Sequence, residues 1–256
     1  MTDTVLVTGG AGRVATRLRP SLRPAWRLRL ADTREPETPA GPGEEVFVGD
    51  LSDPEVAART VDGVDAVMHL AGIASPAAPW DRLRVANVDL SVTMLEAALR
   101  AGVRRVVYAS SNHAAGRYDI EGRVPVTALW PARPCCLYGA SKAAAEAIGS
   151  FYADARGLSV ICLRLGWACP LPHLPRALRQ WISPGDLGRL ANAALTTERH
   201  FGIYYGMSDN TRGRWDLAAA RDELGYIPLD DAEDHVDNVD FDALDPSPCQ
   251  GAGEVA

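Results

Sequence analysis

Tyr138 and Lys142 are the two residues whose types and spacing most directly suggest a chemical reaction. They stand four positions apart in a predicted helix, so both side chains project from one face of that helix. An ammonium group close to a tyrosine favours the phenolate form and lowers the pKa of the phenol. Such a tyrosine can accept a proton from an alcohol near neutral pH, so the pair predicts a base that assists the oxidation of a hydroxyl group.

Two adjacent serines, Ser110 and Ser111, directly follow a predicted strand upstream of this pair. A hydroxyl group at that position can hydrogen-bond a substrate oxygen and stabilise the charge that develops on it. The carboxyl ends of parallel strands are where open α/β sheets bind their ligands. By sequence alone either serine can fill this role, and either can instead cap the end of the strand.

A glycine-rich turn follows the first predicted strand and opens the first predicted helix. Its spacing is Gly9-x-x-Gly12-x-x-Ala15, and Arg13 and Val14 come between the second glycine and the alanine. Glycine lets backbone N–H groups approach a pyrophosphate at a helix N-terminus, and a small third residue permits close helix–strand packing. The turn predicts a dinucleotide site, with an ordinary glycine turn as the alternative.

Asp32 closes the second predicted strand, where a carboxylate can accept hydrogen bonds from the hydroxyls of an adenosine ribose. It would repel a 2′-phosphate, so the sequence favours NAD over NADP, although Arg34 could soften that preference. Asp50 and Leu51 follow the third predicted strand. They are expected to meet the adenine ring, and a helix cap is the alternative role for this turn.

Small residues also end the fourth predicted strand, in the stretch Leu70-Ala71-Gly72. We expect them to let the cofactor lie close to the backbone. The preceding His69 is interpreted as a packed histidine rather than a catalyst.

Short apolar runs alternate with helical patterns over the first 165 residues. The predicted strands are Thr4–Thr8, Arg27–Ala31, Glu45–Val48, Ala66–Leu70, Arg105–Ala109 and Ser159–Leu163. The predicted helices are Gly12–Leu18, Pro54–Val61, Arg82–Ala101 and Tyr138–Arg156. Nearly continuous apolar strands are typical of strands buried on both faces. The alternation predicts an α/β fold with a Rossmann-type, doubly wound parallel sheet and right-handed crossovers.

The pattern changes after residue 165. Clustered prolines predict a loop over 166–185. A helix at Asp186–Thr196, a short strand at Ile203–Tyr205 and a helix at Trp215–Leu224 follow. We therefore expect an NAD-binding domain over 1–165 and a small substrate-binding lobe over 166–244 within one compact unit. Residues 245–256 are expected to be a disordered tail.

Composition is that of a soluble globular protein: the 256 residues are 47% hydrophobic and 23% charged. A net charge of −7 argues against nucleic acid as the main partner. No apolar run reaches the length of a membrane span, and the start of the chain has no signal-peptide pattern, so a cytoplasmic location is expected. The five cysteines, Cys135 and Cys136 among them, predict neither disulfides nor a metal site by their spacing.

Together these motifs resemble the extended short-chain dehydrogenase/reductase superfamily, which includes the NAD-dependent epimerase/dehydratase family. In that superfamily a Ser or Thr, the Tyr and the Lys form the catalytic set. Its Ser-x-x-x-Tyr-Gly pattern, counted back from Gly116, selects Ser111. Ala115 departs from the pattern where an aromatic residue is common, which is expected to weaken one wall of the pocket. Asn87 matches the family's asparagine, and a plain polar helix residue is its alternative reading.

Within the superfamily the chain resembles the uronate dehydrogenases along nearly its whole length. The segments that carry this resemblance are 109–113, 163–166, 176–183, 205–212 and 215–216. The resemblance implies that the anomeric hydroxyl of a hexuronic acid is oxidised to a lactone, with Tyr138 as the base. Lys142 is expected to hold the cofactor ribose and to lower the tyrosine pKa. The residues expected to orient the sugar are Ser75, Ser111, Asn112, His113 and Arg176. Arginine suits a carboxylate because its planar fork can bind both oxygens.

One departure bears on the substrate: Trp167 stands where those enzymes have a small serine in the sugar pocket. Its indole can stack on a sugar face, or it can block a uronate and select a different, sugar-like biosynthetic substrate. An epimerase or dehydratase that retains NAD is the second enzyme class, although Asn112-His113 replaces the acidic pair typical of dehydratases. A non-catalytic cofactor-binding protein is the third reading. The resemblance also suggests a homo-oligomer.

Overall fold

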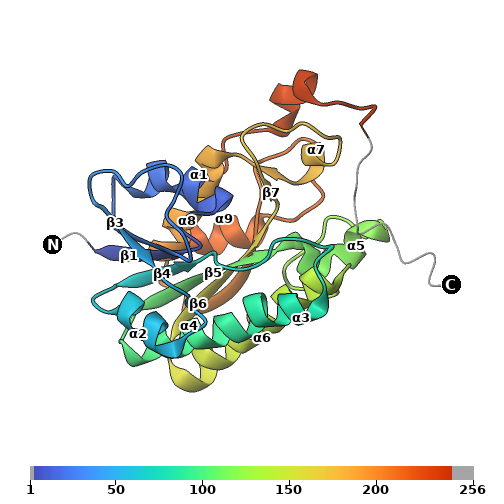
Figure 1. The fold of residues 1–256 in the computed structure, drawn as a ribbon. Coiled ribbons are helices and arrows are strands. Elements are labelled where there is room, and N and C mark those ends of the chain that lie inside the picture. Colours follow the sequence, from blue (N-terminus) through green and yellow to red (C-terminus); the bar gives the residue numbers. More distant parts are fainter. Residues whose placement is uncertain (1–2, 244–256) are drawn as a thin grey trace.

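The computed structural model describes residues 3–243, and a seven-stranded sheet forms its centre (Figure 1). The strands are β1 Thr4–Thr8, β2 Arg27–Asp32, β3 Glu44–Val48, β4 Ala66–His69, β5 Arg105–Ser111, β6 Ser159–Leu165 and β9 Phe201–Gly206. Their order is β3-β2-β1-β4-β5-β6-β9, and every neighbouring pair is parallel. The chain reverses its direction of travel across the sheet between β1 and β4, which opens a crevice at the carboxyl ends of these strands.

Helices cover both faces of this sheet (Figure 1). On one face lie α1 Arg13–Leu22, α8 Pro184–Thr196 and α9 Ala218–Leu224, and on the other lie α2 Pro54–Val61, α4 Leu90–Arg100 and α6 Leu137–Arg156. Side chains alternate along each strand, so Val5 and Val7 enter one core while Leu6 enters the other. The predicted Rossmann-type, doubly wound fold is confirmed.

Local signals explain where the helices begin and end. Asp53 accepts a hydrogen bond from Glu55 N at 2.8 Å and caps α2, with Pro54 at the first helical position. Ser183 caps α8 in the same way through Asp186 N. Gly157 ends α6 at a φ of 75°, a left-handed conformation that favours glycine.

Three sequence expectations about local structure were wrong. The single helix predicted at Arg82–Ala101 consists of α3 Trp80–Leu83, a π-helical turn Arg84–Asp89, and α4. The loop predicted over 166–185 contains β7 Trp167–Ala168, α7 Ala177–Gln180 and β8 Trp181–Ile182, elements too short to show a period in the sequence. The third strand is an edge strand with exposed valines, so its apolar run does not reflect burial on both faces.

The segment after β6 is continuous with the sheet. β9 pairs with β6 along its length, and α8 packs beside α1. The short elements β7, α7 and β8 instead lie beyond the carboxyl ends of the strands (Figure 1). The tail expected over 245–256 lies outside the described residues. Across 3–243, every helix is too short or too polar to cross a membrane.

Candidate active site

The predicted reaction centre comes together where β5 meets α6. Ser111 is the last residue of β5, and Tyr138 and Lys142 lie in the first two turns of α6. All three side chains are buried, and the Ser111 hydroxyl hydrogen-bonds the Tyr138 phenol. Lys142 Nζ donates to the Ala109 carbonyl at 2.8 Å, which fixes the ammonium group beside the end of β5. The geometry therefore places a hydroxyl donor, a phenol and an ammonium group in one buried cluster.

The structure distinguishes the roles of Ser110 and Ser111, which the sequence alone could not separate. Ser110 Oγ donates to Glu146 Oε1 at 2.5 Å, and Arg164 binds both oxygens of that carboxylate at 2.9 and 2.8 Å. Ser110 therefore belongs to a buried ion pair beneath the reaction centre. Successive side chains alternate across a strand, so Ser111 faces Tyr138 instead, as the family pattern indicated.

The expected lowering of the Tyr138 pKa by Lys142 is not found. Burial raises the pKa of Tyr138 to about 12, and the hydrogen bond between Tyr138 and Ser111 opposes this only in part. Burial also lowers the pKa of Lys142 to about 8. The ammonium group lies 4.7 Å from the centroid of the Tyr108 ring, so its charge is directed at that ring and at the β5 backbone. Desolvation therefore dominates both groups.

The glycine-rich turn forms one wall of the crevice at β1. Gly9 has a φ of 67°, and a Cβ there would lie 2.9 Å from Ala71 N. A Cβ on Gly12 would lie 2.9 Å from the Gly9 carbonyl oxygen, and Gly12 is the N-cap of α1. Asp32 Oδ2 accepts from Ala11 N at 3.0 Å, so the end of β2 meets the same turn. Bare backbone, helix N–H groups and a carboxylate fit a dinucleotide here.

Arg34 lies beside this turn, where its Nη2 donates to the Ala11 carbonyl at 3.1 Å and its Nη1 pairs with Glu37. Its guanidinium is therefore within the reach of the predicted adenosine pocket. Arg13, which is exposed, and Val14, which is half-buried, begin α1 at the open side of the turn.

The end of β4 is tied to β1 by one hydroxyl group. Thr8 Oγ1 accepts from Leu70 N and Ala71 N, both at 3.1 Å, and is 2.8 Å from His69 Nδ1. Burial lowers the pKa of His69 to about 3, with Lys142 contributing, so this imidazole is neutral. His69 is thus packed and hydrogen-bonded, as the sequence indicated.

Asn87 anchors the loop that follows β4. Its Oδ1 accepts from Ile73 N at 2.8 Å, and its Nδ2 donates to Ile73 O at 3.0 Å and to Ser141 Oγ at 2.9 Å. Gly72, with a φ of 149°, passes so close that a Cβ would lie 2.6 Å from Asn87 Oδ1. The asparagine therefore holds this loop against α6 from within the π-helical turn, a type of distortion that is frequent at functional sites.

The two residues predicted to meet the adenine ring, Asp50 and Leu51, differ in their burial. Leu51 is buried in the core beside Ala31 and Val61. Asp50 is exposed and accepts from Ser52 N at 2.9 Å. The helix cap of this turn is Asp53, so the capping role does not fall to Asp50.

Opposite the cofactor crevice, Asn112 connects the reaction centre to α7. Ser111 Oγ donates to Asn112 Oδ1 at 3.3 Å, and Asn112 Nδ2 donates to Gln180 Oε1 at 2.6 Å. Gln180 was missed by sequence reasoning. Its position directly before the segment Trp181-Ile182-Ser183, which carries part of the family resemblance, was the one available signal. Ser75 is half-buried in the loop after β4, where its carbonyl accepts from Ala78 N at 3.2 Å.

Trp167 and Arg176 form a stack on this side of the site. The Arg176 Cζ lies 4.6 Å from the centroid of the Trp167 ring, and the His173 ring lies 4.7 Å away, edge-on to the indole. β5 and β6 pair so that Ser111 is opposite Leu165, which puts Trp167 just beyond the strand end next to Ser111. Sequence reasoning singled out both residues but not their contact with each other.

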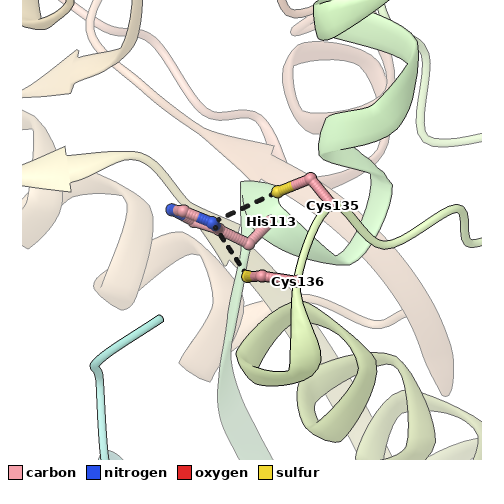
Figure 2. A group of neighbouring side chains, drawn as sticks. All are labelled: His113, Cys135 and Cys136. Atoms are coloured by element: carbon pink, nitrogen blue, oxygen red, sulfur yellow. Dashed lines mark hydrogen bonds between the residues drawn. The ribbon is translucent and has the colours of Figure 1, made fainter. Parts of the chain in front are cut away.

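His113 is brought against Tyr138 and against two thiols. Its ring lies 5.5 Å from the Tyr138 ring in an edge-to-face arrangement. Its Nδ1 lies 3.4 Å from Cys135 Sγ and 3.5 Å from Cys136 Sγ (Figure 2). The cysteine spacing in the chain indicated no metal-ligand cluster, and these three potential donors come together only through the fold.

Comparisons with known proteins agree on the fold and on the family. The model of the NAD dependent epimerase/dehydratase family matches residues 5–169. An NAD-dependent glucose-6-phosphate dehydrogenase from Haloferax volcanii is 36% identical, over 91% of this chain and 95% of that protein. A uronate dehydrogenase from Pseudomonas syringae pv. tomato is 39% identical, over 90% of this chain and 82% of its own. The crystal structure of uronate dehydrogenase from Agrobacterium tumefaciens is 34% identical with a TM-score of 0.85, covering 96% of this chain and 92% of that one.

Proposed function

The chain belongs to the NAD dependent epimerase/dehydratase family and is an NAD-dependent dehydrogenase, and on that premise we propose that it oxidises the anomeric hydroxyl of a sugar acid. The substrate class is a hexuronic acid or a related sugar acid, and the product is its lactone. The observation that carries the proposal is the buried cluster of Ser111, Tyr138 and Lys142 at the end of β5.

Each group of the cluster has a part in the proposed reaction. Ser111 donates to the substrate oxygen, and Tyr138 removes the proton of the anomeric hydroxyl. Bound NAD supplies the acceptor for the hydride that leaves C1. The residues that would hold it are the N–H groups around Gly9 and Gly12, the Asp32 carboxylate and Lys142. The C1–O bond becomes a carbonyl as the proton and the hydride leave.

The pKa of Tyr138 sets a requirement on this reaction. A phenol with a pKa of about 12 retains its proton at neutral pH, so positive charge must approach it during turnover. Lys142 is the cation placed one helical turn away, and its pKa of about 8 lets it release or accept a proton under ordinary conditions. We therefore assign Lys142 the task of assisting proton removal by Tyr138.

Arg176 is the residue to which we assign the binding of the substrate's acid group. Trp167 covers one face of its guanidinium, at 4.6 Å, and the donors around the edge of a stacked guanidinium can still bind an anion in its plane. Carboxylate and phosphate both suit such a fork. This is consistent with relatives described as uronate and glucose-6-phosphate dehydrogenases, since both of those substrates carry an anionic group on the sugar.

The test is formation of NADH by the purified protein with D-glucuronate or D-galacturonate, compared with glucose 6-phosphate and with neutral glucose. We expect turnover with a uronate, and loss of that turnover in Tyr138→Phe. Preference for glucose 6-phosphate would move the assignment to a sugar phosphate. Equal rates with neutral glucose, or no turnover with any anionic sugar while NAD still binds, would contradict the proposal.

A further inference from the structure

Next to the reaction centre the fold gathers one imidazole and two thiols. The side-chain donor atoms of His113, Cys135 and Cys136 all lie within 4.8 Å of one another. Figure 2 shows the Nδ1 edge of the imidazole turned towards both sulfur atoms. Two sulfurs and one nitrogen are soft ligands, which favour ions such as Zn²⁺ over Mg²⁺ or Ca²⁺.

The separations of the imidazole nitrogen from the two sulfurs match those of a tetrahedral zinc site. Zn–S bonds of ≈ 2.3 Å and Zn–N bonds of ≈ 2.0–2.1 Å give an N–S separation of about 3.6 Å around a tetrahedral ion. The separations from His113 Nδ1 are 3.4 Å to Cys135 Sγ and 3.5 Å to Cys136 Sγ. The two sulfurs lie within 4.8 Å of each other, and one ion in contact with all three donors sets their separation at about 3.8 Å by the same bond lengths.

Backbone contacts hold the two segments of this cluster together. Cys135 N donates to the His113 carbonyl at 3.2 Å, and Arg133 N donates to the Ala114 carbonyl at 2.9 Å. A Cβ on Gly116 would lie 2.7 Å from Cys135 Sγ, so the absence of a side chain at that position makes room for the thiol. The arrangement belongs to the fold, and a preformed set of ligands costs less to order around an ion.

The position of Cys136 adds a favourable electrostatic contribution. Its Sγ accepts from Gly139 N at 3.4 Å and caps α6. The amino end of a helix favours negative charge, and a thiolate is the form of cysteine that binds metal. All three residues are half-buried, so an ion can reach them from solvent.

We propose that His113, Cys135 and Cys136 form a binding site for a thiophilic divalent cation such as Zn²⁺, with a fourth coordination position left for water or another small ligand. Binding releases the thiol protons, and two thiolates balance the charge of the ion. The ion fixes the His113 ring through Nδ1. This effect rests on the proposed function: the resemblance to uronate dehydrogenases implies that His113 orients the sugar, so the ion is expected to lower the affinity for sugar and to leave the chemical step unchanged.

Cobalt is the probe for this site, because Co²⁺ replaces zinc and gives thiolate charge-transfer and tetrahedral ligand-field absorption. Reduced protein is titrated with Co²⁺ without oxygen, followed by Zn²⁺. We expect one equivalent of Co²⁺ to give both kinds of band and Zn²⁺ to remove them. Cys135→Ser and Cys136→Ser are each expected to lower the metal affinity by more than about 100-fold, since even second-shell changes cost 10–100-fold.

Two cysteines serve as matched controls. Cys169 is buried elsewhere in the fold, and Cys249 lies outside the described residues, so Cys169→Ser and Cys249→Ser are expected to keep the cobalt spectrum. A serine at 136 can still cap α6, and circular dichroism and NAD binding report whether each variant folds. Absence of charge-transfer bands in the wild-type protein would overturn the proposed site. An equal loss of metal affinity in the control variants would do the same.

The effect on the sugar is measured separately, as KM and kcat with and without Zn²⁺. We expect Zn²⁺ to raise KM for the sugar and to leave kcat unchanged in the wild type, and to change neither KM nor kcat in Cys135→Ser. Zinc binding without a change in KM would overturn the link to the sugar. The cobalt titration needs no turnover, so failure of the metal site and failure of the proposed function give different results.

Discussion

The proposed cofactor crevice at the ends of β1, β2 and β4 and the proposed sugar side, which contains Asn112, Trp167 and Arg176, are built by different means. The crevice is shaped by backbone: Gly9 and Gly12 allow close approach, and the ends of β1, β2 and β4 lie in register. The sugar side is shaped by side chains from separate segments, such as the Asn112–Gln180 hydrogen bond and the stack of Trp167 on Arg176. A substitution on the sugar side can therefore change the substrate without disturbing the crevice, and the two sides should respond separately to mutation.

Tyr138 lies where the two sides meet, and its substitution is expected to have the largest effect. Tyr138→Phe removes the proposed base while keeping the ring that packs against His113. We expect kcat to fall about 10²–10⁴-fold, the usual contribution of a general base, with the affinity for NAD unchanged. Steady-state kinetics and calorimetric NAD binding measure the two quantities. A kcat within a few-fold of wild type would remove Tyr138 from the reaction.

Gly9→Ala tests the backbone character of the crevice. A Cβ there would lie 2.9 Å from Ala71 N at a φ of 67°. The left-handed conformation costs an L-residue about 1–2 kcal/mol, and the contact adds to this, so we expect NAD to bind at least about tenfold more weakly. Gly63→Ala is the matched control, because Gly63 has a φ of 69° but nothing within 4 Å. Equal losses of NAD affinity in both variants would point to general strain instead.

Arg176→Lys tests the side-chain character of the sugar side. Lysine keeps the charge but loses the planar fork and its stacking on Trp167. We expect KM for the anionic sugar to rise about tenfold, equivalent to about 1.4 kcal/mol, with NAD affinity unchanged. Arg179→Lys, an exposed position in α7, controls for the general effect of the exchange. A rise in KM that is the same for neutral glucose would show that Arg176 does not contact the acid group.

The smallest expected effect concerns Lys142 and pH. Burial lowers its pKa from 10.5 to about 8, so the unfolded chain binds more protons than the folded one between these values. The free energy of unfolding should therefore rise with pH as the folded lysine loses its charge. From pH 8 to 9 we expect a gain of about 1 kcal/mol in the wild type relative to Lys142→Met. Urea unfolding of both proteins at each pH measures this, and parallel pH profiles would contradict it.

The difference between the two sides also explains what the sequence could predict. The glycine spacing, the apolar strands and the Tyr138–Lys142 pair are local patterns; the strands predicted the sheet correctly, and the site that the other two indicate stays a prediction. The cluster of His113, Cys135 and Cys136 and the partner of Asn112 depend on contacts between distant segments, which no spacing in the chain reveals. The Tyr138 pKa depends on burial, a property of the folded protein. The elements between β6 and α8 are too short to carry a periodic signal.

The most direct measurement uses D-glucuronate labelled with deuterium at C1, together with NAD and the wild-type protein. If the anomeric hydroxyl is oxidised with Tyr138 as base, the label appears on the nicotinamide of the reduced cofactor and the sugar becomes the lactone. With Tyr138→Phe we expect neither label transfer nor lactone. Label that stays on the sugar, with recovery of an epimer or of a sugar oxidised at another carbon, would contradict the account.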